Sequence, residues 1–331
     1  MTTFYDDISV HRRMVADSVR TEAFRASIAA TVQPGDVVAD VGAGSGILSL
    51  FAAQAGAARV YGIERAPAAA ALARRIVAAN RLEDRIVIIH GDAETARLPE
   101  PVDVIVSEWC GVLGVDENML APLLAARDRW LKPGGKLIPG PVTAWMAPAW
   151  SDAGAAAVMF WNRLYELDLT ALAGFSFDEV VWLSNKVADV ELRAEPKRLW
   201  VTDPATLPAA YASQPFTAQS SFSLRGAVNG LIAWFSAEMP GAAELTNRPG
   251  APATHWGQFL FPVASAVSSE PGEVMSVDFR CLPSPLGGSN YVWSAQVGSG
   301  HVELHDTRRL VRPATSPPWR AYVPGGFADA V

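Results

Sequence analysis

The sequence predicts an α/β protein in which a doubly wound parallel sheet is followed by an antiparallel β domain. A short apolar run, a glycine-rich turn and an apolar helix follow one another within residues 37–57. Strand-like and helix-like segments then alternate as far as residue 140, as they do in a sheet with helices on both faces. Beyond residue 141 apolar residues recur at every second position, which is typical of antiparallel strands with one buried face.

Residues 1–30 are predicted to form helices that precede the sheet, because apolar side chains recur there at roughly helical spacing. These side chains are Val10, Met14, Val19, Phe24 and Ile28. The turn Pro34-Gly35-Asp36 then leads into the first strand. We therefore expect helices over 1–30, a parallel-sheet domain over 31–140 and a β domain over 141–331.

In the parallel-sheet domain, apolar runs predict the strands and the segments between them predict helices. The expected strands are 37–41, 59–63, 85–90 and 102–107, with a fifth after Gly135, and the expected helices are 47–57, 67–80 and 118–131. Pro67 suits the first turn of its helix, where its missing N–H is not needed. A strand order that reverses direction would place the ligand beyond the carboxyl ends of these strands.

In the β domain, the runs with period two are expected to form a β-barrel-like unit. These runs are 143–150, 199–202, 216–224, 230–238, 258–263, 273–281, 291–297 and 301–305. One helix, predicted over 155–172, interrupts them and carries several aromatic and leucine side chains. A helix of this composition belongs either to a core or to an interface.

The glycine-rich turn after the first strand indicates a nucleotide-like ligand. Its glycines are Gly42, Gly44 and Gly46, whereas the dinucleotide fingerprint needs its third glycine one residue later. Glu64 ends the second strand, where a carboxylate accepts hydrogen bonds from both hydroxyls of a ribose. The pattern therefore favours S-adenosylmethionine over NAD, and argues against a nicotinamide dehydrogenase.

Composition and charge narrow the possible functions. The chain has 331 residues, of which half are hydrophobic and 18% are charged, so it can bury a large core. Its net charge of −7 is unlike that of a general nucleic-acid binder and fits a cationic substrate. Two cysteines do not form a disulfide framework, and no apolar run reaches the length of a membrane span. With no signal peptide over residues 1–10, we expect a cytoplasmic protein without nucleic-acid or membrane partners.

Two glutamates, Glu108 and Glu117, bracket a mostly apolar loop after the fourth strand. Like charges this close need a cation or a shared proton. Three interpretations are open: a divalent metal, a proton donor of the kind found in paired-carboxylate hydrolases, or a grip on a guanidinium or ammonium group. A metal is disfavoured because no His or carboxylate cluster lies nearby in the sequence. Glu64, Asp92 to Glu94 and Ser107 to Trp109 are expected at the same sheet edge as the glycine turn.

Several motifs, in order along the chain, resemble the protein arginine methyltransferases. Ser107-Glu108-Trp109-Cys110-Gly111 followed by Glu117-Asn118-Met119-Leu120 is similar to the family's double-Glu loop, and Thr254-His255-Trp256 is similar to its Thr-His-Trp loop. The spacing of Tyr5, Met14, Asp17, Val19-Arg20-Thr21 and Phe24-Arg25 resembles the helices that cover the cofactor in this family. Residues 160–165 resemble its dimerisation arm, which implies a head-to-tail homodimer through 155–172.

The resemblance implies S-adenosylmethionine as cofactor, with S-adenosylhomocysteine as product. Arg20 would bind the methionine carboxylate, Glu64 would hold the ribose, and the adenine would lie against Ala93 and Glu94. The other implied cofactor-binding residues are Tyr5, Met14, Asp40, Gly42, Gly44, Gly46 and Asp92.

The resemblance also implies methyl transfer to the guanidino nitrogen of an arginine in a protein or peptide. Glu108 and Glu117 would clamp the guanidinium, and His255 would pair with Asp17. Either that pair or Glu117 would take the proton that the acceptor loses. The implied substrate-binding residues are Trp109, Met119 and Trp256. Met14 and Met119 match positions that border the accepting nitrogens in members forming asymmetric dimethylarginine.

The double-Glu loop also departs from the family. The family often has aromatic residues where this chain has Val112 and Asp116, and residues 113–115 are small. We therefore expect a widened or reshaped substrate channel with a third negative charge from Asp116. This departure keeps open an alternative acceptor, a small guanidine or amine metabolite.

Overall fold

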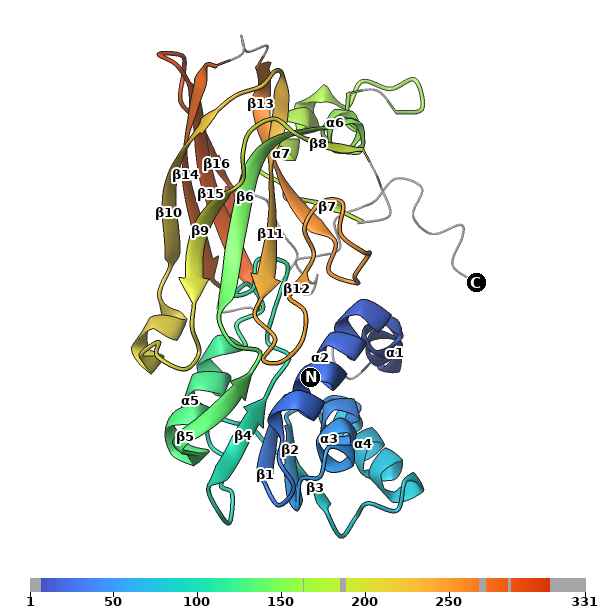
Figure 1. Cartoon of the computed structure of the whole chain (residues 1–331). Helices are drawn as coiled ribbons and strands as arrows, with labels where there is room; N and C mark the ends of the chain where they lie inside the picture. Colours follow the sequence, from blue (N-terminus) through green and yellow to red (C-terminus); the bar gives the residue numbers. More distant parts are fainter. Residues whose placement is uncertain (1–6, 163, 185–188, 268–271, 285–286, 310–331) are drawn as a thin grey trace.

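The chain forms two stacked regions, a parallel sheet with its helices and a larger antiparallel β region (Figure 1). The computed structural model describes residues 7–162, 164–184, 189–267, 272–284 and 287–309. None of the helices in these ranges combines the length and the apolar character that a membrane span requires. The predicted site residue Tyr5 lies outside the described residues.

The first region is a doubly wound parallel sheet, as the alternating pattern predicts. Within the described residues its strands have the order β3-β2-β1-β4-β5, and every neighbouring pair is parallel. The strands are β1 (Val37–Val41), β2 (Arg59–Glu64), β3 (Ile86–His90), β4 (Val102–Val106) and β5 (Leu131–Ile138), and the connecting helices are α3 (Ile47–Gln54), α4 (Pro67–Ala79) and α5 (Leu120–Trp130). The order changes direction between β1 and β4, so a crevice opens beyond the carboxyl ends of these two strands. The Ser107 hydroxyl joins the ends by donating to the carbonyl of Val41 at 2.7 Å.

Two N-terminal helices, α1 (Ile8–Ala16) and α2 (Ser18–Thr31), lie between the parallel sheet and the β region (Figure 1). Asp17 separates them: its backbone N–H closes α1 on the Arg13 carbonyl, and its side chain accepts from the Arg20 N–H and caps α2. Phe24 and Ile28 of α2 are fully buried, and the Ser27 hydroxyl donates to the Pro240 carbonyl at 2.9 Å. The helices are therefore anchored to both regions.

The second region consists of two antiparallel sheets. The described part of one sheet has the order β7-β13-β11-β6-β8, with β9 on β6 and β12 on β11, and the other has the order β10-β14-β15-β16. The first sheet contains β6 (Val142–Ser151), β7 (Val181–Leu183), β8 (Val190–Leu192), β9 (Lys197–Thr202), β11 (Val228–Ala237), β12 (Leu245–Thr246) and β13 (Gln258–Val267). The second contains β10 (Phe216–Ser223), β14 (Val274–Pro283), β15 (Ser289–Val297) and β16 (Glu303–Asp306).

Aromatic side chains from the inner faces of the two sheets form their shared core. Phe261 of β13 packs edge-on against Phe279 of β14 and Trp293 of β15, with ring centroids 4.8 and 5.2 Å away. Trp293 also donates from Nε1 to the Pro262 carbonyl at 2.8 Å, so its buried N–H is satisfied. Alternation of buried and exposed residues along β14 places these rings on the inner face.

The α/β fold class is confirmed, and the differences from the predicted elements are local. The short strands β7, β8 and β12 were not predicted, because two or three residues are too few to show a period. The helix expected from residue 118 begins at Leu120, since Asn118 has a φ of 60°.

The helix predicted over 155–172 is wrong. In the structure α6 (Asp152–Met159) ends early, and a single 3-10 turn (Thr170–Leu172) precedes the short helix α7 (Ala173–Ser176). Tyr165 and Glu166 adopt φ values of 53° and 61°, which a right-handed helix cannot contain. The apolar spacing of this segment therefore reflects a surface loop rather than a continuous helix.

We expect Phe261→Ala to lower the free energy of unfolding by about 3–5 kcal/mol, because the cavity would lie between two sheets that are held together by this ring. Leu304→Ala, at a residue of β16 that is 53% exposed, is the control and should change it by less than about 0.5 kcal/mol. Denaturant unfolding followed by circular dichroism measures both. Equal losses in the two variants would contradict the assignment of the core.

Candidate cofactor and acceptor site

A cavity of about 520 Å³ opens at the carboxyl edge of the parallel sheet. It is lined by the α1–α2 helices, the glycine turn, the ends of β2 and β3, and the loop after β4. Of the predicted site residues it includes Met14, Arg20, Gly42, Gly44, Glu64, Asp92, Ala93, Glu94, Glu108, Glu117 and Met119. The loops that follow different strands therefore meet at one site, as their order in the sequence predicts.

The glycine turn lines this cavity, and Gly42 and Gly44 leave little room for side chains. Gly42, Gly44 and Gly46 have φ values of 76°, 55° and 81°, a region that favours glycine. A Cβ atom on Gly44 would lie 3.2 Å from the His11 ring, and one on Gly42 would lie 3.1 Å from the Met119 methyl group. Gly46 precedes α3 and lies outside the cavity lining. The turn thus leaves backbone exposed to a ligand.

Glu64 lies at the end of β2 and is held rigidly. One of its carboxylate oxygens accepts from the Gly44 N–H at 2.8 Å, and the other accepts from the Ala66 N–H at 2.6 Å. Each oxygen retains a further lone pair, so the carboxylate can still accept ribose hydroxyls. Its backbone partners also tie the glycine turn to the start of α4, which fixes the distance between the two.

Asp40 is buried in the sheet next to the cavity and is not one of the residues that line it. It is fully buried in β1, and the Ser49 hydroxyl donates to its Oδ2 atom at 2.6 Å. Burial raises the pKa of Asp40 to about 6, although the hydrogen bonds from Ser49 oppose this. Among the described residues its Oδ1 atom has no hydrogen-bond partner. Asp40 therefore acts on the turn through α3, which Ser49 belongs to.

Arg20 and Glu108 form a buried ion pair at the centre of the site. The Arg20 Nη2 and Nε atoms donate to Glu108 Oε2 at 3.2 and 3.4 Å, and the side chains are 6% and 10% exposed. The Arg20 Nη1 atom is buried and has no partner within the described part of the chain. Arg20 also lines the cavity, and a guanidinium at this position fits the carboxylate of a bound amino acid.

The two glutamates of the loop after β4 reach the same cavity. Glu108 and Glu117 both line it, and Glu108 Oε1 accepts from the Cys110 N–H at 3.0 Å. Trp109, which we expected at the acceptor, is fully buried and lies outside the cavity lining. No group of metal-ligating side chains exists among the described residues. Both carboxylates therefore border one cavity, and that of Glu108 is already held by Arg20 and the Cys110 N–H.

The segment between the glutamates points into the core, so its small residues do not line the cavity and the expected third negative charge does not face it. Val112, Leu113 and Val115 are buried among core side chains. Asp116 is 6% exposed, and its carboxylate accepts from the Leu113 and Val112 N–H groups at 2.7 and 3.2 Å. Burial raises the pKa of Asp116, although these amides favour its charged form. Asp116 therefore shapes the loop instead of facing a substrate.

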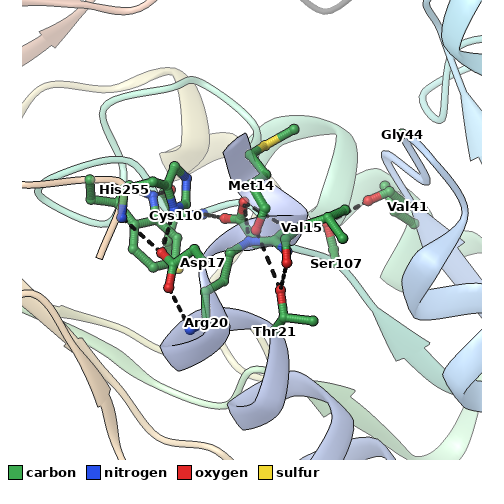
Figure 2. A network of polar contacts seen from close by, with 12 residues as sticks. Met14, Val15, Asp17, Arg20, Thr21, Val41, Gly44, Ser107, Cys110 and His255 are labelled. Carbon is green, nitrogen blue, oxygen red and sulfur yellow. Dashed lines mark hydrogen bonds and ion pairs between the residues drawn. The ribbon is translucent and has the colours of Figure 1, made fainter. Parts of the chain in front are cut away.

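His255 and Asp17 form the second polar pair, next to Arg20 (Figure 2). The Nδ1 atom of His255 lies 2.8 Å from Asp17 Oδ2, and the His255 N–H donates to the same oxygen at 2.8 Å. Burial opposes ionisation of Asp17, but the hydrogen bonds from His255 and the Arg20 N–H outweigh it and lower its pKa. Asp17 thus joins the α1–α2 junction to the Thr254-His255-Trp256 loop.

Trp256 connects this loop to the double-Glu loop. Its Nε1 atom donates to the Cys110 carbonyl at 2.7 Å, and its own carbonyl accepts from Trp182 Nε1 at 2.6 Å. The side chain is 3% exposed and lies outside the cavity lining, as does that of His255. Trp256 therefore does not line the cavity; it connects the Thr254-His255-Trp256 loop to the double-Glu loop and to Trp182.

The cavity also contains residues that we did not predict from the sequence. His11 lies over Gly44, three residues before Met14 on the same helix, and this spacing could have indicated it. Ser284 and Gly287, which lie between β14 and β15, also line the cavity. Asn118 binds that turn by donating to the Gly288 carbonyl at 2.5 Å. Nothing in the sequence connects this turn with Glu117.

The parallel sheet, its reversal point and this cavity define an S-adenosylmethionine-dependent methyltransferase of the doubly wound class. Residues 38–135 match the family model of the methyltransferase domain. Residues 146–290 match that of the arginine methyltransferase oligomerization subdomain.

Known proteins resemble the chain over most of its length. Protein arginine N-methyltransferase 6 of Xenopus laevis is 33% identical, over 85% of this chain and 86% of that protein. The enzyme of the same name from Danio rerio is 35% identical, over 80% of this chain and 78% of that protein. The structure of the Trypanosoma brucei PRMT1 enzyme-prozyme heterotetrameric complex with AdoHcy has a TM-score of 0.80 and 28% identity, and the match covers 92% of this chain and 98% of that one. The chain belongs to the protein arginine N-methyltransferase family.

We expect Asp17→Asn to lower the free energy of unfolding by about 1–3 kcal/mol at neutral pH, because charged hydrogen bonds to His255 and to α2 are lost. Since folding lowers the pKa of Asp17, its contribution is complete above the ordinary value of 3.8 and disappears as the pH falls through the folded-state pKa. The difference between parent and variant should therefore shrink below pH 3.8. Urea unfolding at several pH values measures it, with the exposed Asp84→Asn as control. A difference that does not change with pH would contradict this explanation.

Proposed function

We propose that the chain transfers methyl groups from S-adenosylmethionine to the guanidino nitrogens of arginine in protein substrates. The observation that carries this proposal is the position of Glu108 and Glu117 on one cavity with the glycine turn and Arg20. Membership of the family supports the same activity. A small guanidine metabolite, the alternative acceptor, loses its main argument because the loop residues thought to widen the channel are buried.

On the cofactor side, the residues present fit S-adenosylmethionine. The Arg20 guanidinium suits its carboxylate, Glu64 suits its ribose, and Asp92, Ala93 and Glu94 border the same cavity where the adenine would lie. Met14 and His11 would cover the ligand from α1. When bound, this cofactor supplies an electrophilic methyl group on a sulfonium centre.

On the acceptor side, the two carboxylates would activate the guanidinium. A guanidinium is cationic at physiological pH and its nitrogens are poor nucleophiles. Glu108 and Glu117 would bind two of its nitrogens and draw the positive charge towards them, which leaves the lone pair of the third available. Holding both reactants in one cavity supplies further acceleration by proximity.

The acceptor nitrogen must also lose a proton, and two groups can receive it. Glu117 lies on the cavity itself. The His255–Asp17 pair lies beside Arg20, with the lowered pKa of Asp17 keeping its carboxylate charged beside the imidazole. The pH dependence of methyl transfer in Glu117 and His255 variants distinguishes these two.

Glu117→Gln is expected to lower kcat about 10²- to 10³-fold, because one carboxylate of the clamp becomes neutral, while the affinity for S-adenosylmethionine is unchanged. The assay uses labelled cofactor with an arginine- and glycine-rich peptide, with free arginine in parallel, read by mass spectrometry. Exposed Glu83→Gln is the matched control. Full activity in the Glu117 variant, or transfer to free arginine alone, would contradict the proposed clamp or the proposed acceptor.

We also propose that the chain forms a homodimer through the arm at 155–172. Large apolar side chains are exposed there: Met159, Tyr165 and Leu167 are 57%, 85% and 60% exposed, and Leu172 is 41% exposed. Apolar groups clustered in this way mark interaction surfaces. The match of residues 146–290 to the oligomerization subdomain supports the same conclusion.

The dimer is tested by light scattering coupled to size-exclusion chromatography. The parent should have twice the mass of one chain, and Leu167→Asp should halve it, because a charge would be buried at the interface. Val274→Asp, at a 48% exposed residue of β14, should leave the dimer intact. A monomeric parent, or a Leu167 variant that stays dimeric, would contradict the proposal.

We further propose that the protein works in the cytoplasm and that the chain divides functionally at about residues 30 and 140. Both cysteines, Cys110 and Cys281, are buried and free, which suits a reducing compartment. The helices over 1–30 would cover the cofactor, residues 31–140 would bind it, and residues 141–331 would bind the acceptor protein.

A further inference from the structure

Asn247 is a fully buried amide at the point where the two loops of the acceptor site meet the β region. It follows β12 directly, and its Oδ1 atom accepts from the Phe235 N–H of β11 at 2.7 Å. The Gln258 side chain donates to its carbonyl at 2.6 Å. The amide is therefore fixed to the central strands β11 and β13.

Its Nδ2 group joins the two loops. It donates to the Val112 carbonyl at 3.2 Å and to the Gly257 carbonyl at 2.7 Å. Val112 lies between Glu108 and Glu117, and Gly257 follows His255 and Trp256 directly. One rigid amide group thus holds a carbonyl from each loop.

This arrangement couples the positions of the loops. Both carbonyls and the amide are buried, and a buried polar group that loses its partner is strongly disfavoured. If either loop moved away from β11, it would leave a donor of Asn247 unpaired. The bond from Trp256 Nε1 to the Cys110 carbonyl links the same loops a second time. The two loops are therefore expected to move together.

We propose that Asn247 is a positioning residue, which sets the Glu108–Glu117 carboxylates relative to the His255–Asp17 pair. This inference rests on the proposed function, in which these groups hold and deprotonate the acceptor. Asn247 lies outside the cavity lining, so it acts through the loops and not by contact with a ligand. Its loss should affect methyl transfer more than cofactor binding.

The test compares Asn247→Asp and Asn247→Ala with Asn229→Ala. The Asp variant keeps the shape and the acceptor for Phe235 but cannot donate to both carbonyls, since a carboxyl group has at most one O–H. Asn229 is the matched control, because its Nδ2 donates to the Ser151 carbonyl at 2.8 Å and its Oδ1 accepts from the Ser151 N–H at 3.0 Å, away from both loops. Steady-state kinetics with the arginine- and glycine-rich peptide, calorimetric titration of S-adenosylmethionine, and hydrogen exchange of residues 110–117 and 254–258 are measured for each.

Both Asn247 variants should lower kcat about 10- to 100-fold with cofactor affinity unchanged, since small misplacements of reacting groups have effects of this size. Hydrogen exchange should rise in both loops together, and Asn229→Ala should alter neither loop nor kcat. Parent-like kcat and exchange in Asn247→Asp, or faster exchange in one loop only, would overturn the proposal.

A measurement on the parent keeps the inference testable if the variants do not fold. In low denaturant the amides of 110–117 and 254–258 should exchange through one opening reaction with the same denaturant dependence. Different dependences would overturn the coupling. Because hydrogen exchange needs no turnover, a parent that binds cofactor but methylates no arginine would refute the proposed function and leave the coupling to be judged by exchange.

Discussion

The buried ion pair between Arg20 and Glu108 joins helix α2 to the loop after β4 at the edge of the cavity. Each charge is stable in the interior only because the other is present. Arg20 is fixed by α2, whose first turn is capped by Asp17, and Glu108 is fixed by the Cys110 N–H at the start of its loop. A shift of either the helix or the loop would leave a charge without its partner. The positions of helix α2 and of the loop after β4 are therefore coupled.

Much of this arrangement could be predicted from the sequence because it depends on strand order and local chemistry. Apolar runs indicate β1 to β4, and parallel strands bring their carboxyl ends to one edge, so the glycine turn, Glu64 and Glu108 had to lie close together. No comparable rule predicts that Asp17 and His255, which are 238 residues apart in the chain, lie close together. Only the resemblance of the surrounding motifs suggested that pair, which the structure brings to 2.8 Å.

Other features could not be predicted because a loop has no period. The segment between Glu108 and Glu117 has small residues, which looked like a widened channel, yet Val112 and Leu113 are buried in the core and Asp116 binds the backbone of its own loop. Likewise the apolar spacing over 155–172 resembled a helix, whereas left-handed backbone at Tyr165 and Glu166 ends it. In the double-Glu loop and in residues 155–172 alike, the direction of a side chain depends on backbone φ values and on contacts with distant residues. Neither can be inferred from the types of residue in the segment.

The bond between Asp17 and His255 joins residues that are 238 positions apart in the chain. The parallel sheet is built entirely from residues 37–138, so it can form while later residues are still being synthesised. The complete site cannot form at that stage, because Asp17, between the first two helices, bonds to His255. The loop of His255 leaves the ribosome more than 200 residues later. The nascent protein would therefore have a folded sheet before it has a complete site, and completion of that site would be among the last events of its biosynthesis.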